Sequence, residues 1–123
     1  MKLISVNKIL LTLTTFILLS CHQKTESEFI VGNWKYINIQ KNGLDVIEIM
    51  DNDHMNVKSD STFEYYIESV KKQMKGKWTY SDHTLHLHYS SPDTIRHFKI
   101  DILSKYELKM HEDSVFFLFH TAQ

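Results

Sequence analysis

The sequence predicts an all-β fold, an antiparallel up-and-down meander of eight or nine short strands that closes into a small barrel. Apolar and polar residues alternate in short runs that recur about every ten residues along most of the chain, with turn-forming residues between them. The chain has only three glycines and one proline, which argues against long irregular loops. An open meander exposes its edge strands, and closure into a barrel removes them.

Nine runs have the composition of strands, because they are rich in aromatic and β-branched residues or alternate between apolar and polar positions. They cover residues 34–39, 44–50, 55–57, 62–69, 77–80, 85–89, 98–102, 108–110 and 115–119. The turns between them have recognisable chemistry. Asn42-Gly43 is a strong hairpin signal, Asp51-Asn52-Asp53 is typical of a turn, and Ser91-Pro92-Asp93 has proline in its favoured second position.

One segment, residues 62–75, fits two structures. Apolar residues at helical spacing are Phe63, Tyr66, Ile67, Val70 and Met74. Ser61 and Glu64 also match a capping box, which favours a helix start. Against a helix, the Tyr-Tyr-Ile sequence at 65–67 suits a strand, and every flanking element is a strand. We therefore expect a strand at 62–69 and a loop that continues to residue 75.

The first twenty residues have the pattern of a secretory signal peptide. Lys2 and Lys8 give a basic start, and residues 9–19 form an apolar run interrupted only by threonines. This run is too short to cross a bilayer comfortably, since a spanning helix needs about 20 apolar residues. Leu18-Leu19-Ser20-Cys21 resembles the lipobox of bacterial lipoproteins, and Cys21 is the one cysteine of the chain. The resemblance implies cleavage before Cys21 and attachment of a diacylglyceryl group to its thiol.

The predicted organisation has three parts: a signal peptide at 1–20, a lipidated cysteine with a polar tether at 21–28, and the barrel domain at 29–123. Two acyl chains on Cys21 hold a protein firmly on a membrane, because each buried methylene contributes about 0.8 kcal/mol and a single chain is marginal. The expected location is therefore the bacterial cell envelope, with the protein lipid-anchored to the outer membrane. The anchor makes the membrane a partner of the protein through lipid alone.

Charge and motifs exclude several classes of function. Loss of Lys2 and Lys8 leaves a mature chain with more acidic than basic residues, which argues against nucleic-acid binding. No glycine-rich phosphate loop is present, and no nucleophile and base can be paired. We therefore expect neither an enzyme nor a resident cofactor.

Eight histidines are many for this length, and three of them suggest a weak metal site. A symmetric hairpin about residues 91–94 places His88 opposite His97 and His86 opposite Lys99. In this register Leu87 faces Phe98 and Leu85 faces Ile100 on the other side of the sheet. The three imidazoles of His86, His88 and His97 then share an outward face that suits zinc or copper. No carboxylate or cysteine supplies a clear fourth ligand, so the prediction is no metal.

The sequence also resembles a known family. Val31-Gly32-Asn33-Trp34 places a Gly-x-Trp motif at the first strand, followed by Phe63, Gly76-Lys77-Trp78 and Leu85-His86-Leu87. This order is similar to that of the small lipocalin-like lipoproteins of the Bacteroidetes. The resemblance implies an up-and-down barrel that Trp34 closes at one end, with a cup for a small hydrophobic ligand.

Two functions remain open for this barrel. The first is binding of a small hydrophobic ligand in the cup. The side chains expected to line it are Trp34, Tyr36, Phe63, Tyr65, Trp78, Leu85, Leu87, Phe98, Ile100 and Phe117. The second is a tethered interaction module with a filled barrel that meets another envelope protein. Cavity size separates them, because an interior pocket below about 300 Å³ weighs against the ligand carrier.

Overall fold

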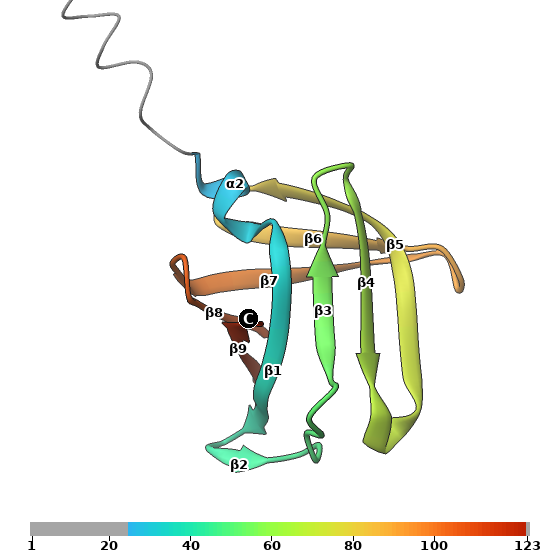
Figure 1. The fold of residues 1–123 in the computed structure, drawn as a ribbon, viewed down its shortest axis with the longest axis vertical. Helices are drawn as coiled ribbons and strands as arrows, with labels where there is room; N and C mark the ends of the chain where they lie inside the picture. Colours follow the sequence, from blue (N-terminus) through green and yellow to red (C-terminus); the bar gives the residue numbers. More distant parts are fainter. Residues whose placement is uncertain (1–24, 123) are drawn as a thin grey trace, which may run out of the picture.

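A computed structural model describes residues 25–122, which form an antiparallel sheet curled into a barrel, with one short helix at one end (Figure 1). The elements in chain order are α2 (Glu26–Ile30), β1 (Gly32–Lys41), β2 (Leu44–Asp45), β3 (His54–Val57), β4 (Thr62–Ile67), the 3₁₀ turn η1 (Glu68–Val70), β5 (Lys72–Ser81), β6 (Thr84–Tyr89), β7 (Thr94–Leu103), β8 (Glu107–Glu112) and β9 (Val115–Thr121). The predicted all-β class is confirmed.

The barrel closes between its first and last long strands. The strands are ordered β2-β1-β3-β4-β5-β6-β7-β8-β9, and β1 also pairs with β9 from Trp34↔Thr121 to Lys41↔Val115. Eight of the described strands form the closed ring, and β2 is an additional strand beside the end of β1. Closure leaves the ring without a free edge, as predicted from the meander.

Strand β4 resolves the ambiguous segment in favour of a strand. Phe63, Tyr65 and Ile67 are buried, while the alternate residues are only partly buried. This two-residue period is that of a strand with one face in the core. The helical alternative is therefore wrong, because the buried face of β4 needs every second residue.

The predicted limits of this strand and of the loop after it are also wrong. The strand ends at Ile67, and Lys71 takes a left-handed conformation with φ 50° after η1. Strand β5 then begins at Lys72 and pairs back along β4 as far as Thr62↔Lys77. Residues 71–75 have the composition of a loop, because the first half of β5 is exposed on its outer face. On its inner face the residues that are partly buried there are Met74 and Gly76.

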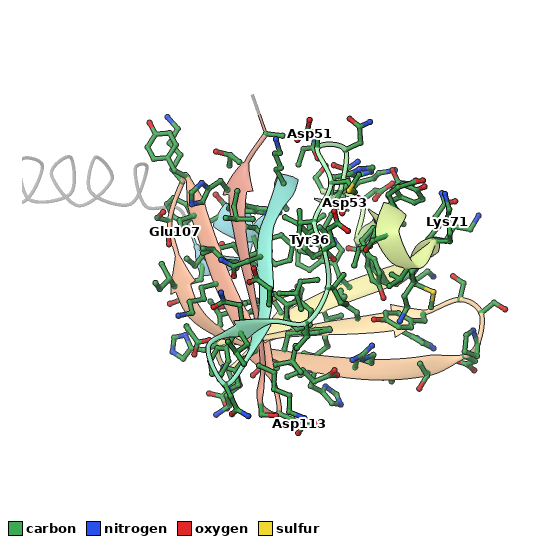
Figure 2. All side chains as sticks on the ribbon, turned by 90° about the horizontal axis from the view of Figure 1, so that it is seen from below. Tyr36, Asp51, Asp53, Lys71, Glu107 and Asp113 are labelled. Atoms are coloured by element: carbon green, nitrogen blue, oxygen red, sulfur yellow. The ribbon has the colours of Figure 1, made fainter. Side chains whose placement is uncertain are left out.

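The second predicted strand, 44–50, is mostly irregular. Only Leu44 and Asp45 pair with β1. Residues 46–50, here called the strap, then cross the end of the barrel, as seen from below in Figure 2. Ile47 and Ile49 of the strap pack against the core with partly buried side chains. Ile47 and Ile49 have the spacing of a strand face because both contact the end of the barrel, and not because they lie on one face of a sheet.

The opposite end of the barrel is closed by α2, which the sequence pattern did not predict. Ile30 at the end of this helix is fully buried, and its carbonyl accepts a 2.8 Å hydrogen bond from Trp34 Nε1. Glu26 accepts a 2.7 Å bond from the Tyr80 hydroxyl, and burial together with this bond raises the pKa of Tyr80 to about 12. The last three residues of the predicted tether, 26–28, therefore lie in a helix that contacts β7.

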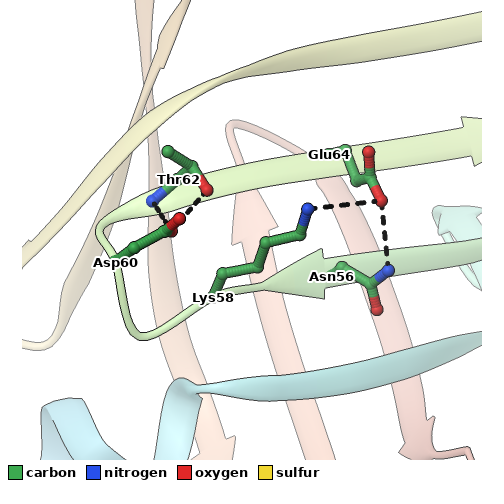
Figure 3. Close-up of polar contacts among 5 residues, drawn as sticks. All are labelled: Asn56, Lys58, Asp60, Thr62 and Glu64. Carbon is green, nitrogen blue, oxygen red and sulfur yellow. Dashed lines mark hydrogen bonds and ion pairs between the residues drawn. The ribbon is translucent and has the colours of Figure 1, made fainter.

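The β3–β4 hairpin shows how the outer face is held in register (Figure 3). In its turn, an Asp60 side-chain oxygen accepts a 3.0 Å bond from the Thr62 backbone N–H and another from the Thr62 hydroxyl. Across the two strands, Glu64 accepts a 3.3 Å bond from Asn56 and lies 3.7 Å from the Lys58 ammonium. These contacts are exposed or half-buried, so they specify register more than they add stability.

Candidate functional site

A cavity of about 250 Å³ lies at the β2 end of the barrel, opposite α2. Side chains from strands all around the ring line it, and Val46 and Ile47 of the strap form part of its wall. Figure 2 looks into this end, with Tyr36 near the middle of the view and Lys71 at the periphery. The strap therefore borders the cavity mouth, and no residue of α2 at the opposite end lines the cavity.

The ten residues predicted to line the cup divide into two groups. Those that line the cavity are Tyr36, Tyr65, Leu87, Phe98 and Phe117. Those that do not are Trp34, Phe63, Trp78, Leu85 and Ile100. Trp34, Phe63 and Leu85 are almost completely buried in the core, and Trp78 and Ile100 pack against it from partly exposed positions.

An ion pair on the cavity wall was not predicted. Arg96 donates from Nε to Glu112 Oε2 at 2.8 Å, and its second nitrogen also contacts Glu112 Oε1, so the pairing is bidentate. The guanidinium also lies 5.6 Å from the centre of the Phe98 ring. The signal was present in the sequence, since Arg96 has the same strand parity as Phe98 and must face the same side.

Three tyrosines bring hydroxyl groups to the same cavity. The hydroxyls of Tyr65 and Tyr89 lie 3.0 Å apart in a hydrogen bond. Tyr36 is 4% exposed, and no hydrogen bond reaches its hydroxyl from any of residues 25–122. Burial, reinforced by Tyr65 and Tyr89, raises the pKa of Tyr36 well above its ordinary value, so this hydroxyl keeps its proton. The site thus combines apolar walls with one ion pair, two hydroxyls that bond to each other and one hydroxyl without a hydrogen bond from residues 25–122.

The strap is fastened by Asp53, which is fully buried. One carboxyl oxygen accepts a 2.8 Å bond from the Met50 N–H, and the other accepts a 2.9 Å bond from the Glu68 N–H. The Asp53 carbonyl also accepts a bond from the N–H of Tyr36 at 3.2 Å. A single side chain thus ties the strap and η1 together beside the cavity-lining Tyr36.

Replacing Asp53 with alanine is expected to destabilise the domain by about 3 kcal/mol, because two part-buried backbone N–H groups lose the carboxyl group that accepts from them. Asp53→Asn retains one acceptor oxygen and should lose roughly half as much. Urea unfolding measures both, and amide exchange locates the effect. The Met50 and Glu68 amides should exchange much faster in Asp53→Ala, and unchanged protection of both would refute the fastening role.

The histidine hairpin has a different register from the one predicted. His86 pairs with His97, His88 with Ile95, Leu85 with Phe98 and Leu87 with Arg96. The loop consists of residues 90–93 between the paired Tyr89 and Thr94, one position earlier than expected, and this slips every pair by two residues. An even slip preserves the faces, so the apolar side chains still point inward.

The three histidines do not converge. His86 Nδ1 lies 2.6 Å from His97 Nδ1, but His88 bonds to Asp93 at 2.5 Å instead. Within residues 25–122, no three histidine, cysteine, aspartate or glutamate side chains are grouped so that they could hold a metal ion. The three histidines keep the predicted outward face, but only His86 and His97 are in contact on it.

The predicted signal peptide and the lipidated Cys21 lie outside the described residues. In the part of the chain that the structure describes, no helix has the length and apolar character needed to cross a membrane.

Comparison with known proteins agrees with the barrel architecture. A family model described as a lipocalin-like domain matches residues 30–110, well over half of the chain. The chain belongs to this lipocalin-like family. The predicted resemblance is therefore confirmed for the fold, and the matched region includes the Gly-x-Trp motif and the ring from β1 into β8.

Solved structures with the same fold come from Bacteroides species. A lipocalin-like protein from Bacteroides uniformis superposes with a TM-score of 0.64 at 14% identity, covering 76% of this chain and 99% of its own. An uncharacterized protein from Bacteroides eggerthii superposes with a TM-score of 0.62 at 12% identity, covering 75% of this chain and 98% of its own. A DUF4847 family protein from Bacteroides vulgatus superposes with a TM-score of 0.56 at 14% identity, covering 77% of this chain and 95% of its own. No curated protein sequence matches this lipocalin-like chain.

Proposed function

We propose that this protein is a lipid-anchored, non-enzymatic binding protein of the bacterial cell envelope, held on the outer membrane through Cys21. Its lipocalin-like barrel binds one small, mainly apolar molecule at the β2 end. The observation that supports this is the cavity itself, which has apolar walls from Phe98, Met55 and Met110 and few polar groups. Such a combination is typical of small-molecule sites.

The cavity volume restricts the size of the ligand. At about 250 Å³ it falls below the roughly 300 Å³ that separates the two functions, which weighs against the ligand carrier and restricts any ligand to a small molecule. An apolar cavity of about 150 Å³ is enough for benzene. The proposed ligand is therefore a compound of one or two rings.

The position of the anchor supports access from the aqueous side. Helix α2 and strand β2 lie at opposite ends of the barrel (Figure 1), and the cavity is at the β2 end. Cys21 precedes α2 by only a few residues, which span at most roughly 17 Å when extended. Lipid on Cys21 would hold the closed end toward the membrane and leave the cavity mouth facing away from it.

The cavity is tested with the full lipidated chain carrying ¹³C-methyl methionine, titrated with indane. Met55 and Met110 line the cavity, whereas Met74 is partly buried elsewhere and Met50 is exposed on the strap. Indane should shift the methyl signals of Met55 and Met110 and leave Met74 in place. No shift of the first two at saturation, or a shift of Met50 alone, would contradict a cavity ligand.

The anchor is tested on protein extracted from the bacterium that makes it. Mass spectrometry should find an N-terminus at Cys21 that carries a diacylglyceryl group. A Cys21→Ser chain should leave the membrane fraction. An unmodified thiol in the exported protein, or a retained leader, would remove the anchoring part of the proposal.

A second function, an envelope interaction module, is favoured by the small cavity and by exposed apolar side chains near its mouth. Leu44 is 71% exposed, and Val46, Met50 and Val70 are also exposed on the strap and neighbouring elements. Single apolar residues on a surface are ordinary, so these carry less weight than the cavity. A negative indane titration combined with an intact anchor would favour this module.

A further inference from the structure

We propose that the ligand carries a neutral hydrogen-bond acceptor, a ring-attached carbonyl oxygen, and that the hydroxyl of Tyr36 donates to it. This inference rests on the proposed function and specifies the chemistry of the same cavity. The observation behind it is the unpaired hydroxyl of Tyr36. This side chain is 4% exposed, it lines the cavity, and no residue in the range 25–122 bonds its hydroxyl.

The other polar groups on the buried wall already have partners. The hydroxyls of Tyr65 and Tyr89 bond to each other at 3.0 Å. Arg96 is held by Glu112 through a bidentate contact. Among residues 25–122 no fully buried side-chain nitrogen or oxygen lacks a partner, so the unbonded Tyr36 hydroxyl is reachable from the cavity space. Small-molecule sites use a few such polar groups to orient their ligands. Tyr36 is therefore the group on this wall that a ligand would satisfy.

The charges around the site indicate a neutral acceptor. The Arg96 guanidinium is neutralised by Glu112, and the Lys72 side chain at the rim is exposed to solvent. A ligand carboxylate placed beside Tyr36 would carry a large desolvation cost, because the lining cation that no carboxylate neutralises, Lys72, is exposed at the rim. Tyr36 itself remains protonated, because burial raises the pKa of its hydroxyl. A carbonyl oxygen matches a neutral donor in an apolar pocket.

The test compares two ligands of nearly the same shape in the full chain. Indane lacks an acceptor, and 1-indanone carries a carbonyl on the same two-ring frame. Dissociation constants are measured from the methyl shifts of Met55 and Met110 for the natural chain and for Tyr36→Phe. We expect Tyr36→Phe to weaken 1-indanone binding about fivefold and to leave indane binding equal or tighter, given the net value of one hydrogen bond.

A matched control is Tyr106→Phe, because Tyr106 is 60% exposed and does not line the cavity. It should change neither affinity. If Tyr36→Phe weakens the binding of both compounds equally, or of neither, the assigned role of the hydroxyl is wrong, while the cavity remains a binding site. If neither compound binds the natural chain, the proposed function fails first. The double comparison therefore separates the two failures.

Discussion

Gly76→Ala is expected to destabilise the domain by about 3 kcal/mol or more and to lower its thermal midpoint by roughly 15 °C. A Cβ at this position would overlap the backbone carbonyl of His88, lying 2.9 Å from its carbon and 3.0 Å from a ring carbon of Phe63. The backbone of β6 cannot move away easily, because Gly76 pairs with Tyr89 on one side and with Phe63 on the other. Figure 1 shows β5 bending strongly as it passes from β4 to β6.

The matched control for this substitution is Gly32→Ala. A Cβ at Gly32 would lie 3.7 Å from Trp34 Nε1, which is ordinary van der Waals contact, and the glycine does not have a left-handed backbone. We expect a change of less than about 1 kcal/mol in the free energy of unfolding. Thermal unfolding followed by circular dichroism measures both variants. Equal midpoints for Gly76→Ala and the natural protein would contradict the close approach of β5 and β6.

Trp34→Ala is expected to cost about 4 kcal/mol, since it removes a large side chain that is 1% exposed and leaves a cavity in the core. It also leaves the Ile30 carbonyl without the 2.8 Å bond from Trp34 Nε1. The expected consequence is loss of α2 docking as well as lower stability. Urea unfolding gives the total, and amide exchange in α2 shows whether the helix detaches.

Trp34→Phe separates packing from the hydrogen bond. It retains an aromatic ring but lacks the indole N–H, so we expect a loss of about 1–2 kcal/mol. Because Trp34 does not line the cavity at the other end, indane binding should persist in this folded variant. If the Trp34→Phe protein is as unstable as Trp34→Ala, the aromatic ring adds little to the free energy of unfolding, and the hydrogen bond of the indole N–H accounts for most of the loss.

The barrel could be predicted because its signal is local. In β4 and β6 the apolar and polar residues alternate, and this alternation is sufficient to define which side chains face the core. Register could not be predicted as well. The hairpin loop begins at Ser90, one residue before the expected turn, so each cross-strand partner moves by two positions. Sequence composition alone does not distinguish these two loops.

Other differences have physical causes of the same kind. Helix α2 has five residues, too few for a periodic signal, and it is held by the buried Ile30 and by contacts of Glu26. The strap was read as a strand because Ile47 and Ile49 are spaced like an inward face. In the structure they pack on the barrel end without a pairing partner.

The candidate site was only partly visible in the sequence. Aromatic residues were expected inside, and five of the ten named side chains do line the cavity. Which half of the barrel remains hollow depends on how side chains from distant strands fill it, and a single sequence does not contain this information. Arg96, Glu112 and Asp53 were missed because charged residues were assigned to the surface, although two of them pair with each other and Asp53 bonds backbone groups.

The most direct test of the account is a crystal structure of the full chain with 1-indanone. We expect the ring system between Phe98, Met55 and Met110 at the β2 end, with its carbonyl oxygen about 2.8 Å from the Tyr36 hydroxyl. Density for the compound only on the outer surface, with core side chains occupying the space beside Tyr36, would contradict it.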